Sequence, residues 1–138
     1  MTEQADNKKK VEKFFLQWEA SFDEMCNGFV QLMTEECLWK QAGIPDIRGA
    51  SNAIAFLKQF REGYGLETAR VEILNLLADG NFVISERIDH LRRADGSLMA
   101  SIPAVGVMEF THGKISGWRE YFDSATMVPI MASTGPKV

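Results

Sequence analysis

Residues 82–122 decide the fold of this chain, and they read FVISERIDHLRRADGSLMASIPAVGVMEFTHGKISGWREYF. With the run before them they form four stretches rich in β-branched and aromatic residues, as is typical of strands: 67–78, 82–93, 97–111 and 114–122. The connections between them are short turns that contain glycine, at 79–81, 94–96 and 112–113. Because such short turns join antiparallel neighbours, the sequence predicts a meander. Pro103 cannot donate to a strand ladder and suggests a bulge or an edge there.

The residues before 67 predict three helices and one more strand. Helices are expected at 6–20, 22–33 and 50–62, the second opened by the capping-box pair Ser21 and Glu24. A first strand is expected at 36–41, joining the meander at its edge, and a loop at 42–46. Helices followed by a bent sheet indicate the α+β class. We predict a strongly curved, mainly antiparallel sheet that forms a cone, closed by three N-terminal helices.

The composition favours one domain. With 138 residues, of which 46% are hydrophobic, residues 1–138 can bury a single core, with flexible ends expected at 1–6 and 132–138. The net charge of −4 and the lack of a basic stripe argue against a nucleic-acid partner. No apolar run approaches the roughly 20 residues that span a bilayer, which predicts no membrane partner. The first residues lack the apolar core of a signal peptide, so we expect a cytoplasmic protein.

Metal and nucleophile chemistry find little support in the sequence. Cys26 and Cys37 lack metal-type spacing and are expected to be buried, reduced thiols. His90 and His112 do not form a ligand cluster, and neither a phosphate loop nor a nucleophile elbow is present. We therefore expect no metal and no cofactor, and chemistry that uses carboxylates, arginine, amides and water.

Two strand segments bring together the residues that suggest chemistry. Arg87 and Asp89 are two positions apart on one strand and share a face, about 6.6 Å apart along it. Glu120 shares its face with Trp118 and Phe122, which are apolar and expected to point inward. In one curved sheet, this places two carboxylates and a guanidinium in an apolar pocket. Such a cluster is costly to bury and usually serves chemistry, although it can also simply stabilise the sheet.

The strings ERIDHL at 86–91 and GKISGWREYFD at 113–123 resemble the limonene epoxide hydrolase family. This family lies within the nuclear-transport-factor-2-like, or SnoaL-like, superfamily of cone folds, which the order of elements also resembles. The resemblance extends over residues 11–123 and is densest from 86 onward. The cone fold, which is also called cystatin-like, is what this resemblance implies for the chain.

The resemblance implies roles for five residues. Asp89 falls where the family has its proton-donating aspartate, and Arg87 where an arginine bridges two carboxylates. Glu120 falls where the family has an aspartate that activates water, and Trp39 and Gln41 where a tyrosine and an asparagine hold that water. Each of the three replacements keeps part of the chemistry, since a carboxylate, an amide and an aromatic N–H donor remain.

The resemblance also implies a pocket wall and an assembly. Ile102 and Ala104 match wall positions of the family, and Phe122 shares the face of Glu120. Cone folds of this type commonly pair through the outer face of the sheet. On that face we expect an apolar row, interrupted by Glu86, of Phe82, Ile84 and Ile88. We therefore predict a homodimer.

From the residues and the resemblance we predict a small, cofactor-independent hydrolase that adds water to an epoxide on a small apolar substrate. Two alternatives stay open. The first is a SnoaL-like polyketide cyclase or a ketosteroid-isomerase-like enzyme, in which Asp89 or Glu120 moves a proton beside a carbonyl. The second is a noncatalytic domain that binds an apolar ligand or serves dimerisation.

Overall fold

The computed structural model describes residues 2–133. Its elements, in chain order, are α1 (Glu3–Ala20), α2 (Phe22–Leu32), β1 (Met33–Gln41), β2 (Ile44–Arg48), α3 (Gly49–Tyr64), β3 (Thr68–Asp79), β4 (Phe82–Arg92), β5 (Leu98–Thr111), β6 (Lys114–Tyr121), the 3₁₀ turn η1 (Ser124–Met127) and α4 (Val128–Ser133). Of the ends expected to be flexible, residues 3–6 form the first turn of α1 and residues 132 and 133 end α4. Residues 1 and 134–138 lie outside the described part of the chain.

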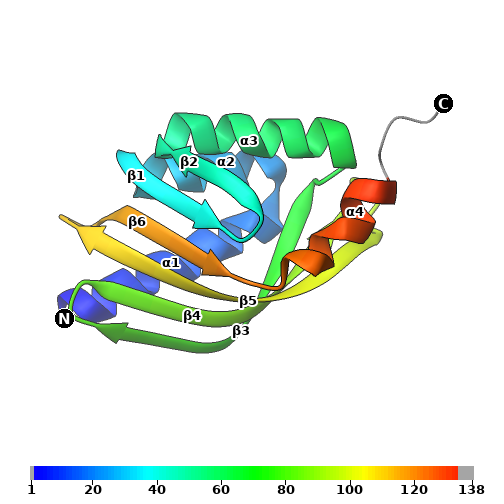
Figure 1. Cartoon of the computed structure of the whole chain (residues 1–138). Coiled ribbons are helices and arrows are strands. Elements are labelled where there is room, and N and C mark those ends of the chain that lie inside the picture. The colour runs from blue at the N-terminus through cyan, green and yellow to red at the C-terminus, as the bar shows by residue number, and fades with distance from the viewer. Residues whose placement is uncertain (1, 134–138) are drawn as a thin grey trace.

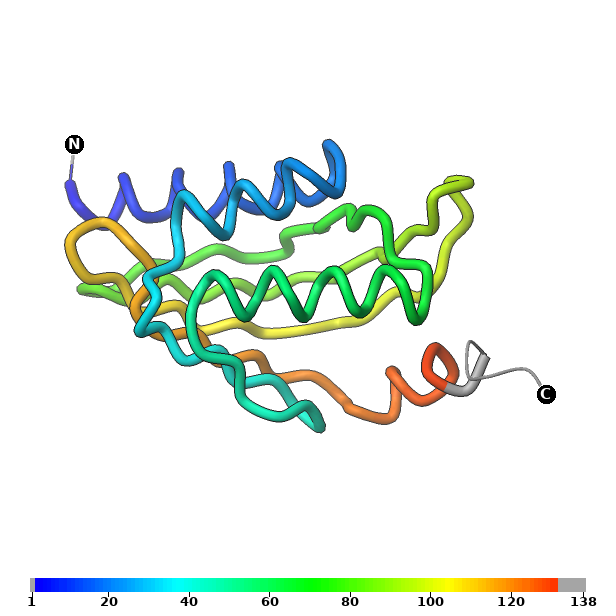
Figure 2. The backbone as a smooth tube through the Cα atoms, turned by 90° about the horizontal axis from the view of Figure 1, so that it is seen from above, coloured from blue at the N-terminus to red at the C-terminus, as the bar shows by residue number. Residues whose placement is uncertain are grey.

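The sheet confirms the predicted fold class. Its strand order is β2-β1-β6-β5-β4-β3, and only the β1–β6 pair among these neighbours is parallel. Figures 1 and 2 show α1, α2 and α3 gathered on one side of the curved sheet. There α1 packs on β3 and β4, and α3 packs on β1 and β2. Helices and sheet together enclose the space in which the candidate site lies.

Two details of the sheet differ from the sequence prediction. The expected loop at 42–46 is largely β2, which pairs with β1 through Trp39 opposite Ile47. Pro45 favours a loop reading, but an edge strand tolerates proline because one side of its backbone has no partner. Met33, which we expected at the end of α2, instead begins β1, because it pairs with Ile115 of β6.

The placement of β1 and of Pro103 is as predicted, whereas the predicted burial of Cys26 is wrong. β1 joins the meander at the edge of β6, and β2 extends the sheet beyond it. Pro103 marks an edge rather than a bulge, because β6 pairs with β5 only from Val105 onward. Cys37 is buried, whereas Cys26 is only half-buried, and both are free thiols. Within residues 2–133 no helix is both long and apolar enough to cross a membrane.

An aromatic cluster fills the concave side of the sheet. Trp39 and Trp118 are register partners on β1 and β6, and their rings stack with centroids 4.6 Å apart. Phe29 of α2 meets Phe14 of α1 edge to face at 5.0 Å. Each such pair contributes about 0.5–1.5 kcal/mol beyond the burial of its surface. Trp39 also lines the pocket described below, so this cluster forms a rigid floor for the site.

Candidate active site

Strand register aligns the polar residues of the site. Ser85, Arg87 and Asp89 alternate along β4 and are all buried on its concave face. Ser85 is opposite Gly106 of β5, Gly106 is opposite Glu120 of β6, and Glu120 is opposite Gln41 of β1. These four residues form one row across four strands, which places Gln41 next to Glu120. Gly106, which has no side chain, leaves open space between Glu120 and β4.

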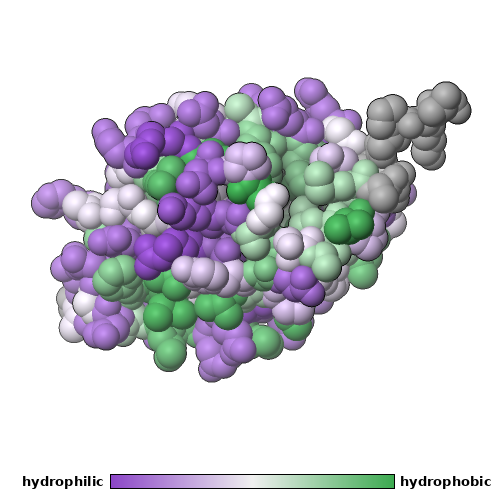
Figure 3. Space-filling model, viewed as in Figure 1, coloured by the Kyte–Doolittle hydropathy of each residue, from purple (hydrophilic) through white to green (hydrophobic). Residues whose placement is uncertain are grey.

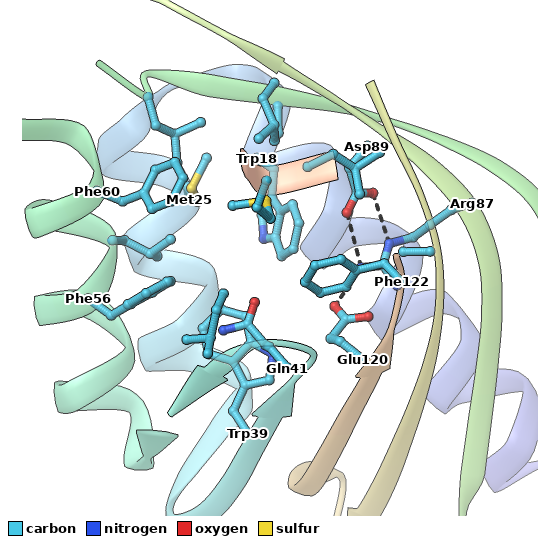
Figure 4. A pocket seen from close by; sticks show the side chains of 18 residues that line it. Trp18, Met25, Trp39, Gln41, Phe56, Phe60, Arg87, Asp89, Glu120 and Phe122 are labelled. Carbon is cyan, nitrogen blue, oxygen red and sulfur yellow. Dashed lines mark hydrogen bonds and ion pairs between the residues drawn. The ribbon is translucent and has the colours of Figure 1, made fainter. Parts of the chain in front are cut away.

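Arg87 holds both carboxylates. Its Nε donates to Asp89 Oδ1 at 2.9 Å and its Nη2 to Asp89 Oδ2 at 3.1 Å, a bidentate pair. The same Nη2 donates to Glu120 Oε1 at 2.5 Å. Arg87 is 2% exposed, Glu120 6% and Asp89 9%, so this network is almost completely removed from water. Figure 4 shows the two carboxylates pointing into the pocket with the guanidinium between them.

Three further residues support the guanidinium, and none had a clear sequence signal for this role. Ser85 Oγ accepts from Arg87 Nη1 at 3.0 Å. The centroid of the Phe15 ring lies 4.8 Å from Arg87 Cζ, in a cation–π arrangement. A Cβ at Gly106 would lie 2.7 Å from Arg87 Nη1 and 2.9 Å from Glu120 Oε2, so only glycine leaves both groups in place. Strand register decides these contacts.

Burial and charge shape the protonation of the cluster. Burial raises the pKa of Glu120, and the nearby Asp89 adds to this, although the charge and hydrogen bond of Arg87 oppose it. Burial would lower the pKa of Arg87, but Glu120 and Asp89 raise it overall, so Arg87 stays charged. The cluster holds one positive charge, on Arg87, and two carboxyl groups. Its net charge is zero when the two carboxyl groups share one proton. Such a cluster can offer an acid and a base at once.

The network forms one edge of an apolar pocket of about 100 Å³. All eight sequence-selected site residues line it: Trp39, Gln41, Arg87, Asp89, Ile102, Ala104, Glu120 and Phe122. The roles assigned to them stay predictions. The helices, the strands β2, β3 and β4, the α3–β3 connection and the segment after β6 add lining residues that were not selected from the sequence: Trp18, Met25, Ile44, Phe56, Leu57, Phe60, Leu66, Ala69, Leu91 and Met127. The helical spacing of Trp18, Phe56 and Phe60 in the sequence indicates a buried face of each helix, but not which residues of that face reach a cavity.

Several polar atoms at the pocket have no partner among the described residues. They are the indole nitrogens of Trp18 and Trp39, Nε2 of Gln41 and Oε2 of Glu120. Buried polar groups are nearly always hydrogen-bonded, so unpaired ones in a pocket point to water or ligand. Gln41 and Trp39 offer donors, and Glu120 offers an acceptor. This set suits a water molecule that must be held and deprotonated.

Within residues 2–133, no group of three His, Cys, Asp or Glu side chains is arranged to hold a metal ion. Fold and site thus define a cone-fold protein with a carboxylate–arginine–carboxylate network in an apolar pocket. The family model of the limonene-1,2-epoxide hydrolase catalytic domain matches residues 5–132, and the chain belongs to this family.

Known relatives agree with this assignment. The chain is 33% identical over 89 residues to epoxide hydrolase EphG of Mycobacterium tuberculosis (strain ATCC 25618 / H37Rv). That match covers 64% of this chain and 56% of the relative, so the chain matches little more than half the length of EphG.

Solved structures share the fold. An M. tuberculosis LEH-like epoxide hydrolase superposes with a TM-score of 0.75 at 24% identity, covering 96% of this chain and 94% of the other. A putative SnoaL-like polyketide cyclase from Jannaschia sp. CCS1 superposes with a TM-score of 0.73 at 16% identity, covering 97% of this chain and 95% of the other. At these identities the likeness concerns the fold alone.

Proposed function

We propose that this protein is a cofactor-independent hydrolase that adds water to an epoxide on a small apolar substrate. The observation that carries the proposal is the single guanidinium of Arg87 that holds Asp89 and Glu120 at the edge of an apolar pocket. Membership of the limonene-1,2-epoxide hydrolase family supports it.

In this mechanism Gln41 Nε2 and Trp39 Nε1 donate to a water oxygen, and Glu120 Oε2 accepts one of its protons. The water oxygen attacks an epoxide carbon as the C–O bond to that carbon breaks. Asp89 gives its proton to the departing oxygen, which yields a diol in one concerted step. Glu120 ends protonated and Asp89 ionised, and return of the proton from Glu120 to Asp89 resets the site. The net charge of the cluster never changes.

The test is turnover of a neutral epoxide in water labelled with the heavy oxygen isotope. We expect one labelled oxygen per diol, and a loss of about 100-fold or more in kcat for both Asp89→Asn and Glu120→Gln. Asp79→Asn and Glu109→Gln make the same chemical changes outside the pocket and should retain activity. Near-full activity in both site variants would refute the acid–base assignment.

A proton-transfer enzyme is the second candidate, favoured by the raised pKa of Glu120, because a more basic carboxylate abstracts a proton from carbon more readily. It predicts that an enolisable ketone exchanges its α-proton in deuterated water while epoxides remain intact. If neither reaction occurs and apolar ligands still bind, the noncatalytic alternative takes first place.

We further propose that the protein acts in the cytoplasm as a homodimer that pairs through the outer face of the sheet. The apolar residues on that face, considered in the Discussion, support the dimer.

A further inference from the structure

A second apolar hollow lies beside the pocket, and we call it the outer chamber. It is lined by the β1–β2 turn, the C-terminal half of α3 and the segment that follows β6: Ala42, Gly43, Ile44, Pro45, Phe56, Gln59, Phe60, Gly63, Tyr64, Ser124, Met127, Val128 and Met131. None of these side chains is charged. In Figure 3, hydrophobic surface gathers where Figure 1 places α4 and the neighbouring turn.

The outer chamber adjoins the pocket. Ile44, Phe56, Phe60 and Met127 line both hollows, so these four side chains form the boundary between them. The rim is closed on one side, because a Cβ at Gly43 would lie only 3.0 Å from Cβ of Ser124. A ligand longer than the pocket would have to cross this boundary, beside Met127, to reach the outer chamber.

The exposed rim is unusually apolar for a protein surface. Val128 is 61% exposed and Met131 51%, and both line the outer chamber. Large exposed apolar side chains beside a pocket are typical of ligand-binding grooves. The inner pocket, at about 100 Å³, is small compared with the roughly 300–1,000 Å³ of most ligand sites, so a larger ligand needs more room.

We propose that the outer chamber binds the apolar chain of an epoxide whose reactive ring sits in the inner pocket. This rests on the proposed function and narrows its substrate class to neutral epoxides with an extended hydrocarbon chain. The absence of charged side chains among the lining residues, within the described part of the chain, selects against a carboxylate or phosphate at the end of that hydrocarbon chain. Met127 and Phe60, at the boundary, set which chains pass.

The experiment compares 1,2-epoxydecane with 1,2-epoxybutane. Because each buried methylene favours binding, we expect kcat/KM to be at least about tenfold higher for the longer epoxide. In Val128→Asp and Met131→Asp, the ratio of the two kcat/KM values should fall about tenfold, because a charged group now faces the chain. An unchanged ratio in both variants would overturn the proposal.

Val30→Asp is the matched control, since Val30 is 60% exposed on α2 and lines neither hollow. It should keep the wild-type ratio, and thermal melts verify that all variants fold. Light scattering is run alongside. If Val128→Asp splits an oligomer, α4 is an interface and the outer chamber is not a substrate site.

A binding measurement separates failure of this inference from failure of the proposed function. Trp18 and Trp39 line the pocket, so their fluorescence reports occupancy by 1-decanol or 1-butanol, neither of which can react as an epoxide. We expect decanol to bind at least about tenfold more tightly, and Val128→Asp to remove most of that difference. Equal affinities for the two alcohols would refute the proposed binding role of the outer chamber, even if epoxides are hydrolysed. If no epoxide is hydrolysed but decanol binds as expected, only the proposed reaction fails.

Discussion

At the scale of the residue, the two oxygens of Glu120 have different surroundings. Oε1 accepts from Arg87, whereas Oε2 is buried without a partner among residues 2–133. The pKa of this carboxyl is raised, with burial as its main cause. The bound oxygen anchors the side chain and leaves the other free to accept a proton from water.

The raised pKa of Glu120 predicts the pH dependence of activity. A base must be ionised, so kcat/KM should fall as the pH drops through the raised pKa, with a midpoint above the ordinary 4.5 of glutamate. The pH–rate profile of the wild type measures this midpoint. A midpoint at or below 4.5 would contradict the role of Glu120 as the base.

The free energy of unfolding should change in the opposite sense. The folded state holds the proton of Glu120 more tightly than the unfolded state, so stability declines as the pH rises from about 4.5 through the folded pKa. Urea unfolding should show this decline in the wild type and a flatter profile in Glu120→Gln. Glu109→Gln should follow the wild type.

Gly106 predicts a steric effect on the same network. In Gly106→Ala the new Cβ would lie 2.7 Å from Arg87 Nη1 and 2.9 Å from Glu120 Oε2. Both groups are buried and hydrogen-bonded, so we expect a loss of about 1–3 kcal/mol in stability and of about 100-fold in kcat. Urea unfolding and steady-state kinetics measure the two effects. Gly63→Ala, where the new Cβ meets no described atom within 4 Å beyond its chain neighbours and its own helix backbone, should be neutral or stabilising.

At the scale of the element, β1 carries Trp39 and Gln41, the two residues proposed to hold water, and sets Gln41 beside Glu120, the proposed base. Its parallel pairing with β6 sets Gln41 opposite Glu120 and Trp39 opposite Trp118. The hairpin with β2 covers the other edge of β1, which holds that strand in register. Donors on β1 and the base on β6 therefore keep a constant separation without any flexible loop.

This pairing predicts the effect of Gln41→Leu. The variant keeps the volume of the side chain but removes the amide donor, so a water molecule loses one of its contacts. We expect kcat to fall by about 10- to 100-fold with little change in KM, because the water and not the substrate loses its partner. Lys40→Leu, whose side chain is 55% exposed on the same strand, is the control and should retain kcat. An equal rise in KM would show that Gln41 binds substrate instead.

At the scale of the whole molecule, the outer face of the sheet bears more apolar surface than a solvent-facing sheet needs. Phe82 and Ile84 on β4 are each 37% exposed, and Leu77, the register partner of Ile84 on β3, is 62% exposed. Glu86 interrupts the row but receives a hydrogen bond from Asn75 at 2.7 Å. Such a face is suited to packing against a second copy.

We predict a homodimer that Ile84→Asp disrupts. A charge placed at the centre of an apolar interface is desolvated without a partner, so the dimer should dissociate at micromolar concentrations. Light scattering measures the mass, and Val30→Asp, on the helical side, should remain dimeric. A monomeric wild type over the same range would contradict the prediction.

The sequence by itself determined the features that depend on local period and turns. Alternation along residues 82–93 set Arg87 and Asp89 on one face, and the short turns set the antiparallel order of β3 to β6.

The tertiary structure alone decided which strands are neighbours across the sheet, and in which register. That register sets Gly106 between Ser85 and Glu120 and pairs the proline-containing β2 with β1. The tertiary structure also brings α3 and Met127 to the pocket, which they line together with the strands. These contacts join residues far apart in the chain, so no local sequence pattern encodes them. The register matters because a shift of one residue would turn the opposite face of a strand toward the pocket.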